Sequence, residues 1–215
     1  MPDSEPAASP SAPPVSFSVD YPDRELDRLS TAFRIILGIP FAIVVSSIGS
    51  TTLNTASTGR DLVINGTGLL FLPPLLMILF RQKYPRWWFD WNLQLLRLVN
   101  RLAAYLLLLD DHYPATDDEQ AVRLDLRYPD ARVDLNRWLP LVKWFLAIPH
   151  YIVLAFLFVG AVVAAVIAWF AIIFTGRYPR GLFNFVVGVM RWNVRVVAYA
   201  GILVTDAYPP FRLRP

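Results

Sequence analysis

Long runs of apolar residues dominate the chain. Two runs cover residues 32–53 and 62–80, and a third extends from residue 138 to residue 174 almost without interruption. About 20 apolar residues are enough to cross the ~30 Å hydrocarbon core of a bilayer. The first two runs therefore predict one span each. The third would be about 55 Å long as one straight helix, so we expect it to turn near Gly160 and form two spans.

Two other segments, residues 86–109 and 180–203, have the periodicity of amphipathic helices with a narrow polar stripe. The stripe positions are Asp90, Gln94, Arg97 and Arg101 in the first, and Asn184, Gly188, Arg191 and Arg195 in the second. Such helices are typical of the membrane interface. A fifth span over 89–109 would place two arginines in the bilayer, at a high cost. Residues 16–20 and 122–127 alternate in character and predict two short strands that could pair.

Composition and charge support a membrane protein and suggest its orientation. Hydrophobic residues make up 55% of the chain and charged residues 17%, against ~25% charged in an average globular protein. Of the 20 Lys and Arg residues, only Arg60 lies between the first two spans, and none lies between the last two. The positive-inside rule then predicts a multi-pass protein of the cytoplasmic membrane with both termini in the cytoplasm.

Several short motifs occur twice in the same order. The matched stretches are VDYPD (19–23) and LRYPD (126–130), RIILGIP (34–40) and KWFLAIP (143–149), KYPR (83–86) and RYPR (177–180), and DDHYP (110–114) and TDAYP (205–209). These motifs predict a first membrane repeat (16–114), an acidic linker (115–121) and a second repeat (122–211). The Pro/Ala/Ser-rich composition of residues 1–15 predicts a disordered tail. Each repeat would hold two spans and one amphipathic helix. The copies would have parallel topology in the membrane and be related by an axis along the membrane normal.

The second half also resembles a known family. It carries AWFAIIFTGRYPRGLFNF (168–185) and TDAYPPF (205–211), after YPD (128–130) and IPH (148–150). This pattern is similar to a bacterial, largely actinobacterial, family of multi-pass membrane proteins catalogued as a domain of unknown function, often in tandem. The resemblance is strongest over 126–211 and weaker over 19–114, where Ile-Pro is followed by Phe41 instead of His. It implies a membrane location and topology, and no activity.

The candidate functional residues are mainly arginines. The chain has no cysteine and no common catalytic motif, so we expect no catalytic residue, cofactor or metal site. We expect His150 to be an interfacial or interhelical hydrogen-bonding residue rather than a proton relay or metal ligand, and His112 to lie in a solvated linker. The residues expected to contact lipid phosphate or an acidic partner are Arg86, Arg97, Arg101, Arg180, Arg191 and Arg195. A purely anchoring role for them is the simpler alternative, and we expect Asp90 or Asn184 to hold the first arginine of each pair.

These observations favour a non-enzymatic scaffold or accessory subunit, all-α apart from a short two-stranded cytoplasmic β element. Its partners would be membrane lipids, including anionic phospholipid, and a second membrane protein or another copy of the chain, but no nucleic acid. One alternative is a small transporter or lipid-handling protein that uses the interface between the repeats. Another is a membrane enzyme with a site built from the cytoplasmic arginines. The lack of acidic residues inside the predicted spans disfavours ion coupling.

Overall fold

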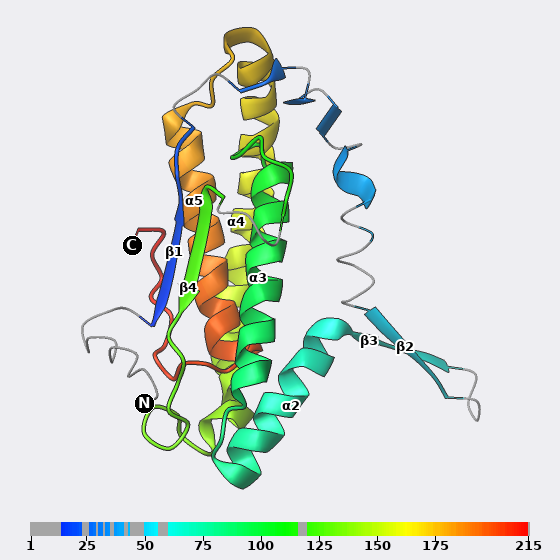
Figure 1. Ribbon diagram of the computed structural model, residues 1–215, viewed down its shortest axis with the longest axis vertical. Helices are drawn as coiled ribbons and strands as arrows, with labels where there is room; N and C mark the ends of the chain where they lie inside the picture. The colour runs from blue at the N-terminus through cyan, green and yellow to red at the C-terminus, as the bar shows by residue number, and fades with distance from the viewer. Residues whose placement is uncertain are drawn as a thin grey trace, which may run out of the picture.

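The computed structural model describes residues 14–22, 26–28, 30–31, 33–34, 37–40, 43, 50–55, 60–115 and 120–214, with the backbone alone for 50–55 and 60–72 (Figure 1). Its elements are β1 (Val15–Val19), β2 (Ser50–Thr55), β3 (Arg60–Asn65), α2 (Gly66–Arg81), α3 (Arg86–Leu106), β4 (Val122–Leu126), α4 (Leu139–Thr175), α5 (Arg180–Val196) and the π-helical turn η1 (Val197–Gly201). Most of the predicted tail and linker lies outside the described residues.

The turn predicted near Gly160 is wrong, because α4 is a single helix of 37 residues. One glycine inside a helix costs only about 1 kcal/mol relative to alanine. Close packing against α5 offsets that cost, since a Cβ at Gly160 would lie 3.3 Å from Cζ of Phe185. In the described part of the chain, α4 is the one helix long and apolar enough to cross a membrane, and the four predicted spans are not seen.

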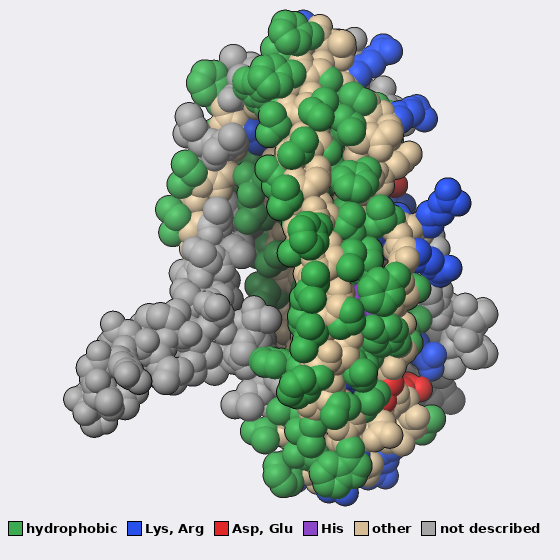
Figure 2. All heavy atoms as spheres, turned by 180° about the vertical axis from the view of Figure 1, so that it is seen from behind, with side chains coloured by type: hydrophobic (Ala, Val, Ile, Leu, Met, Phe, Trp, Pro, Cys, Tyr) green, Lys and Arg blue, Asp and Glu red, His purple; other side chains and the backbone are tan. Residues whose placement is uncertain are grey.

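One face of α4 is buried against α5, and the rest of its surface is apolar and exposed. The buried positions are three, four or seven residues apart, as expected for one face of a helix: Pro140, Lys143, Ala147, His150, Leu154, Ala161, Ala164, Ala168 and Ile172. Three alanines in this stripe allow α5 to approach closely over the second half of the helix. Outside the stripe, large side chains such as Phe145, Phe156 and Phe174 are exposed. Figure 2 shows this side of the molecule as an almost continuous hydrophobic surface with Lys and Arg along its margin.

In the first half of the chain, separate helical residues, a β-hairpin and helix α2 take the place of this long helix. The described residues between 28 and 43 are helical, β2 and β3 pair antiparallel, and α2 begins only at Gly66. The ends of the two predicted spans, at 50–53 and 62–65, are therefore strand rather than helix. Their sequences, STTLNT and RDLVIN, are rich in β-branched and polar residues, which favour a strand over a helix.

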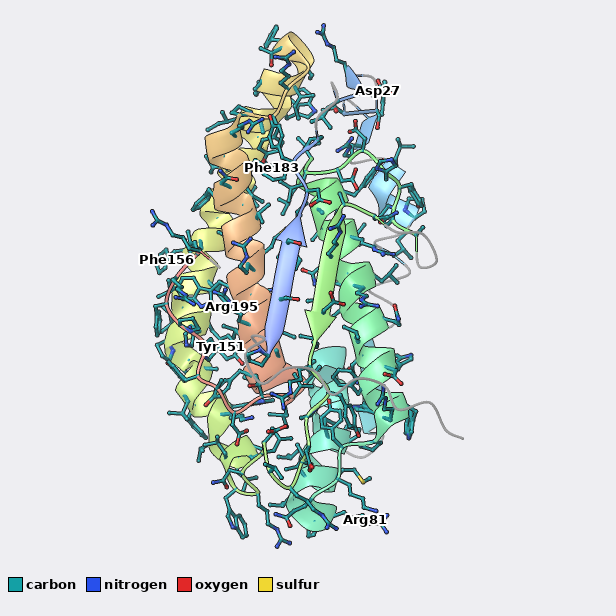
Figure 3. The ribbon with its side chains drawn as sticks, turned by 60° about the vertical axis from the view of Figure 1, so that its left-hand side comes forward. Asp27, Arg81, Tyr151, Phe156, Phe183 and Arg195 are labelled. Atoms are coloured by element: carbon teal, nitrogen blue, oxygen red, sulfur yellow. The ribbon has the colours of Figure 1, made fainter. Side chains whose placement is uncertain are left out.

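The predicted pair of short strands is confirmed. β1 and β4 pair antiparallel, with Phe17 opposite Leu124 at the centre of the register. Both strands bury alternate residues, and they lie over α3 and α5 (Figures 1 and 3). Phe17 and Leu124 also occupy matched positions when VDYPD is aligned with LRYPD. The strand pair therefore has the symmetry of a two-fold axis perpendicular to the strands, because it is antiparallel and centred on matched residues.

The packing crosses between the halves of the chain. β1, from the first half, contacts α5 from the second, whereas β4 contacts α3. The predicted helices over 86–109 and 180–203 are confirmed as α3 and α5. α5 is buried on nearly all sides, with Phe183, Val186 and Val189 in the main core. The molecule is therefore layered: the strand pair, then α3 and α5, then the apolar helix α4.

Candidate functional site

The polar stripe of each amphipathic helix faces a strand of the opposite half. Nε of Arg97 on α3 donates to the carbonyl of Leu124 at 2.8 Å, and Nε of Arg191 on α5 donates to the carbonyl of Phe17 at 3.0 Å. These acceptors are the two residues at the centre of the strand pair. The two arginines thus hold the strands on the helices. Asp90 is not the partner of Arg97, which pairs instead with Asp125 at 2.7 Å.

The Tyr-Pro turns meet across the same boundary. The phenol of Tyr128 donates to the carbonyl of Tyr84 at 2.5 Å, and the phenol of Tyr21 donates to the carbonyl of Tyr178 at 2.5 Å. Tyr84 and Tyr178 are buried, and burial raises the pKa of both phenols. Each Tyr-Pro turn before a helix therefore packs against the Tyr-Pro that follows a strand of the other half. The sequence predicted turns and anchors here, but not this pairing.

Arg86 and Arg180, two of the predicted contact residues, lie over aromatic rings. The guanidinium of Arg86 is 5.1 Å from the ring centre of Tyr128, and that of Arg180 is 4.7 Å from the ring centre of Tyr21. Both arginines are exposed. A cation–π contact at an exposed site is worth about 0.5–1 kcal/mol. These two side chains thus help to fix the Tyr-Pro turns while they add positive charge to the surface.

Sequence reasoning missed a buried ion pair at the start of α4. Lys143 is fully buried, and its Nζ lies 2.7 Å from Oδ1 of Asp206 and donates to the carbonyl of Thr205 at 2.8 Å. The ring of Tyr199, in η1, lies 5.0 Å from the same nitrogen. A buried ammonium needs such partners, because an unpaired charge is strongly disfavoured in a medium of low dielectric constant. This cluster ties the C-terminal segment to α4.

A matching pair holds the first half together. Arg34 is buried, forms an ion pair with Asp111, and donates from Nη1 to the carbonyl of Asp110 at 3.0 Å. Its guanidinium lies 4.8 Å from the ring centre of Tyr105. The repeated motifs held the signal for both pairs, since they align Arg34 with Lys143 and the second Asp of DDHYP with the Asp of TDAYP. A basic and an acidic residue at matched positions of two repeated motifs could have suggested the contact.

His150 makes an interhelical hydrogen bond, one of the two roles expected for it. Nε1 of Trp192 on α5 donates to Nδ1 of His150 on α4 at 3.1 Å. The imidazole stacks on Phe211 with the ring centres 4.1 Å apart. This contact fixes the C-terminal segment against both helices. His112 lies 2.8 Å from a carboxylate oxygen of Asp110, and the described residues hold no group of three side chains able to bind a metal ion.

Two surface clefts flank the strand pair, one beside each arginine pair. The cleft between α3 and β4 is lined by Arg97, Arg101 and Arg123, together with Asp20 and Asp125. The two carboxylates form ion pairs, Asp125 with Arg97 and Asp20 with Arg123 at 3.0 Å. Nη1 of Arg101 donates to the carbonyl of Ala115. Among the described residues, two of the three arginines of this cleft have an acidic partner.

The cleft between α5, β1 and the C-terminal segment is lined by Arg191, Arg195 and Arg212, and its volume is about 390 Å³. No carboxylate of a described residue lines it. Nη1 of Arg191 donates to the carbonyl of Leu213 at 3.0 Å, and Arg195 contacts the carbonyls of Arg212 and Arg214 at 3.2–3.4 Å. Figure 3 shows Arg195 between α5 and the C-terminal segment, beside β1. Burial, and next the charges of Arg191 and Arg212, lower the pKa of Arg195.

Comparison with known proteins gives a family match for the C-terminal third of the chain. Residues 138–212 match the family described as "Domain of unknown function (DUF4389)". The matched region contains α4, α5, η1 and most of the C-terminal segment, including Lys143, His150, Arg191 and Arg195. No curated protein and no solved structure matches the chain.

Proposed function

We propose that the chain is a non-enzymatic membrane scaffold or accessory subunit whose helix α4 lies along the cytoplasmic leaflet of the membrane. The exposed surface of α4 carries the proposal. Its one charged residue, Lys143, is buried, whereas large apolar side chains such as Phe156 and Val159 are 75% and 65% exposed. An apolar surface of this length is stable only against lipid or another apolar surface.

The charges at the two ends of α4 favour a helix parallel to the membrane. Arg137 lies just before the helix and donates to the carbonyl of Leu79, near Arg81, and Arg177 and Arg180 follow its other end. Figure 3 shows Arg81 at one end of the molecule and Phe183 toward the other. An upright helix would place one of these basic ends outside, against the positive-inside rule. At about 55 Å it would also exceed a ~30 Å hydrocarbon core.

We further propose that the two halves are tandem copies of one unit. Support comes from the matched contacts: Arg97 with Leu124 and Arg191 with Phe17, each joining a helix of one half to a strand of the other. The axis that would relate the copies is perpendicular to the strands and points from the strand pair toward the apolar layer. With α4 in the plane of the membrane, this axis is parallel to the membrane normal, as the sequence predicted for parallel repeats.

A scaffold fits the interface between the halves better than a transport path does. Phe17, Leu124 and Phe183 are each no more than 5% exposed and belong to one apolar core that joins strands and helices of both halves. A path for a substrate would need polar or water-filled space at this place. Such packing instead gives a rigid body that presents the strand pair on the side away from α4, with the arginine clefts flanking it.

The orientation can be tested with single cysteines at the two ends of α4. Val133 is 81% exposed, and a Cβ at Gly181 would meet no atom within 4 Å, so both positions tolerate cysteine. In a chain without native cysteine, a membrane-impermeant thiol reagent should label Val133→Cys and Gly181→Cys in inside-out vesicles and neither in intact cells. The buried Ala164→Cys variant is the control for leakage into the core. Labelling of one end alone in intact cells would show that α4 crosses the membrane, and labelling of both ends would place α4 on the outer leaflet; either result contradicts the proposal.

The scaffold role has its own test. Purification in a mild detergent, followed by cross-linking and mass spectrometry, should recover a second protein or a second copy of the chain in a fixed ratio. A chain that elutes as a monomer and forms no cross-link in its native membrane would contradict the scaffold role and leave the membrane orientation unaffected.

A further inference from the structure

The two clefts beside the strand pair occupy matched positions but differ in charge. Aligning VDYPD with LRYPD places Ser18 of β1 at the position of Asp125 in β4. Asp125 neutralises Arg97, whereas Ser18 lines the other cleft beside Arg191 and provides only a hydroxyl. The segments that follow the matched Tyr-Pro motifs differ in the same sense, since ATDDE follows the first and PFRLR follows the second.

Among the described residues, the arginines of the second cleft have fewer hydrogen-bond acceptors than donors. A guanidinium has five N–H groups in a rigid fork. Arg191 uses Nε and Nη1 for the carbonyls of Phe17 and Leu213. The contacts of Arg195 with backbone carbonyls are at the long end of the range for N–H···O hydrogen bonds. Arg212 is exposed and lines the same cleft. Three cations thus converge on one space.

We infer that the cleft lined by Arg191, Arg195 and Arg212 binds one phosphate-bearing anion, and that the matched cleft beside Arg97 does not. Arginine forks bind phosphate oxygens in pairs, and charge-assisted hydrogen bonds are about twice as strong as neutral ones. The serine hydroxyls of β1 add neutral donors at the rim. A bound dianion would also relieve the mutual repulsion of Arg191, Arg195 and Arg212, which the present arrangement leaves without a carboxylate among the described residues.

The dimensions of the cleft suit a phosphate ester better than a bare ion. Its volume of about 390 Å³ falls within the range of small-ligand sites, roughly 300–1,000 Å³. Part of its lining is apolar, from Phe17, Tyr208 and Pro209. A phosphate would contact the arginines while a small organic group lies against this wall. The phosphate could belong to a lipid headgroup or to a soluble ester, and the proposal goes beyond membrane attachment in either case.

One substitution tests the site without removing an arginine. Ser18→Asp reproduces in the second cleft the carboxylate that Asp125 provides in the first. The full chain in nanodiscs of zwitterionic lipid would be titrated with inorganic phosphate and glycerol phosphate by calorimetry, and lipid retention would be measured by mass spectrometry after exchange into nanodiscs containing phosphatidylglycerol. We expect Ser18→Asp, and separately Arg195→Gln with Arg212→Gln, to weaken binding at least tenfold. The matched control, Arg123→Gln in the other cleft, should change it less than twofold.

The outcomes separate the two sources of phosphate. Binding of the soluble phosphates that is lost in Ser18→Asp identifies a soluble ligand, and loss of retained phosphatidylglycerol alone identifies a headgroup site. The proposal is overturned if Ser18→Asp changes neither measurement, or if Arg123→Gln weakens both as much as Ser18→Asp does. Because binding is measured on purified protein, failure here is independent of the orientation of α4 and of any partner.

Discussion

Replacing Asp206 by asparagine should destabilise the fold by about 3 kcal/mol, because it leaves a buried ammonium without its counter-ion. Lys143 is fully buried, and its Nζ lies 2.7 Å from Oδ1 of Asp206. Asparagine has nearly the same shape and can still accept the hydrogen bond that the backbone N–H of Asn136 donates to Asp206 at 2.6 Å. The substitution therefore removes the charge and little else.

The magnitude follows from the burial of the two partners. Loss of one partner of a buried ion pair typically costs 3–5 kcal/mol. Asp206 is 21% exposed, so water screens part of the interaction and places the cost near the lower limit. Asp111, which pairs with Arg34, is only 8% exposed. The matched substitution Asp111→Asn should therefore be the more destabilising of the two, at about 4–5 kcal/mol.

Thermal unfolding in detergent gives the measurement. For a chain of this size, about 3 kcal/mol corresponds to a decrease in Tm of roughly 6–12 °C. The control is the double variant Lys143→Met with Asp206→Asn, which removes both charges and fills the space with a flexible apolar side chain. It should regain most of the lost stability, since replacing both partners of a buried pair by apolar or neutral groups is often neutral.

Two results would refute this reasoning. If Asp206→Asn lowers Tm by less than about 2 °C, the lysine finds another partner or water, and the ion pair does not hold the C-terminal segment on α4. If the double variant is as unstable as the single one, the loss comes from altered packing rather than from an unpaired charge.

Three further predictions concern packing and hydrogen bonds. Ala164→Leu on the buried stripe of α4 should cost about 1–3 kcal/mol in unfolding experiments, whereas the exposed Val163→Leu should stay within about 0.5 kcal/mol; equal effects would mean that α5 does not lie against this stripe. Gly188→Ala would place a Cβ 2.8 Å from Cβ of Leu213 and so displace the C-terminal segment from α5. Trypsin should therefore cleave after Arg212 faster than in the parent chain, and an unchanged rate would contradict the contact. Tyr21→Phe and Tyr128→Phe should each cost about 1 kcal/mol, and a large difference between them would contradict the matched packing of the two halves.

The sequence by itself determined the features that depend on local pattern. Apolar runs indicated α4 and α2, stripes of polar residues indicated α3 and α5, and alternation indicated β1 and β4. These predictions succeed because periodicity of 3.6 or 2 residues reflects which side of an element is buried, whatever it is buried against. The matched motifs also placed the residues of both ion pairs in register before their contact was known.

Only the tertiary structure decided what those elements touch. Arg191 binds the carbonyl of Phe17, 174 positions away in the chain, and no local pattern encodes that distance. α4 continues past Gly160 because α5 packs against it there, and that contact outweighs the small helix penalty of one glycine. The charge of each arginine cleft likewise depends on the residue that the opposite half brings to it: Asp125 beside Arg97, and Ser18 beside Arg191. Long-range contacts of this kind form only when the whole chain folds, so they remain hidden in the sequence of either segment alone.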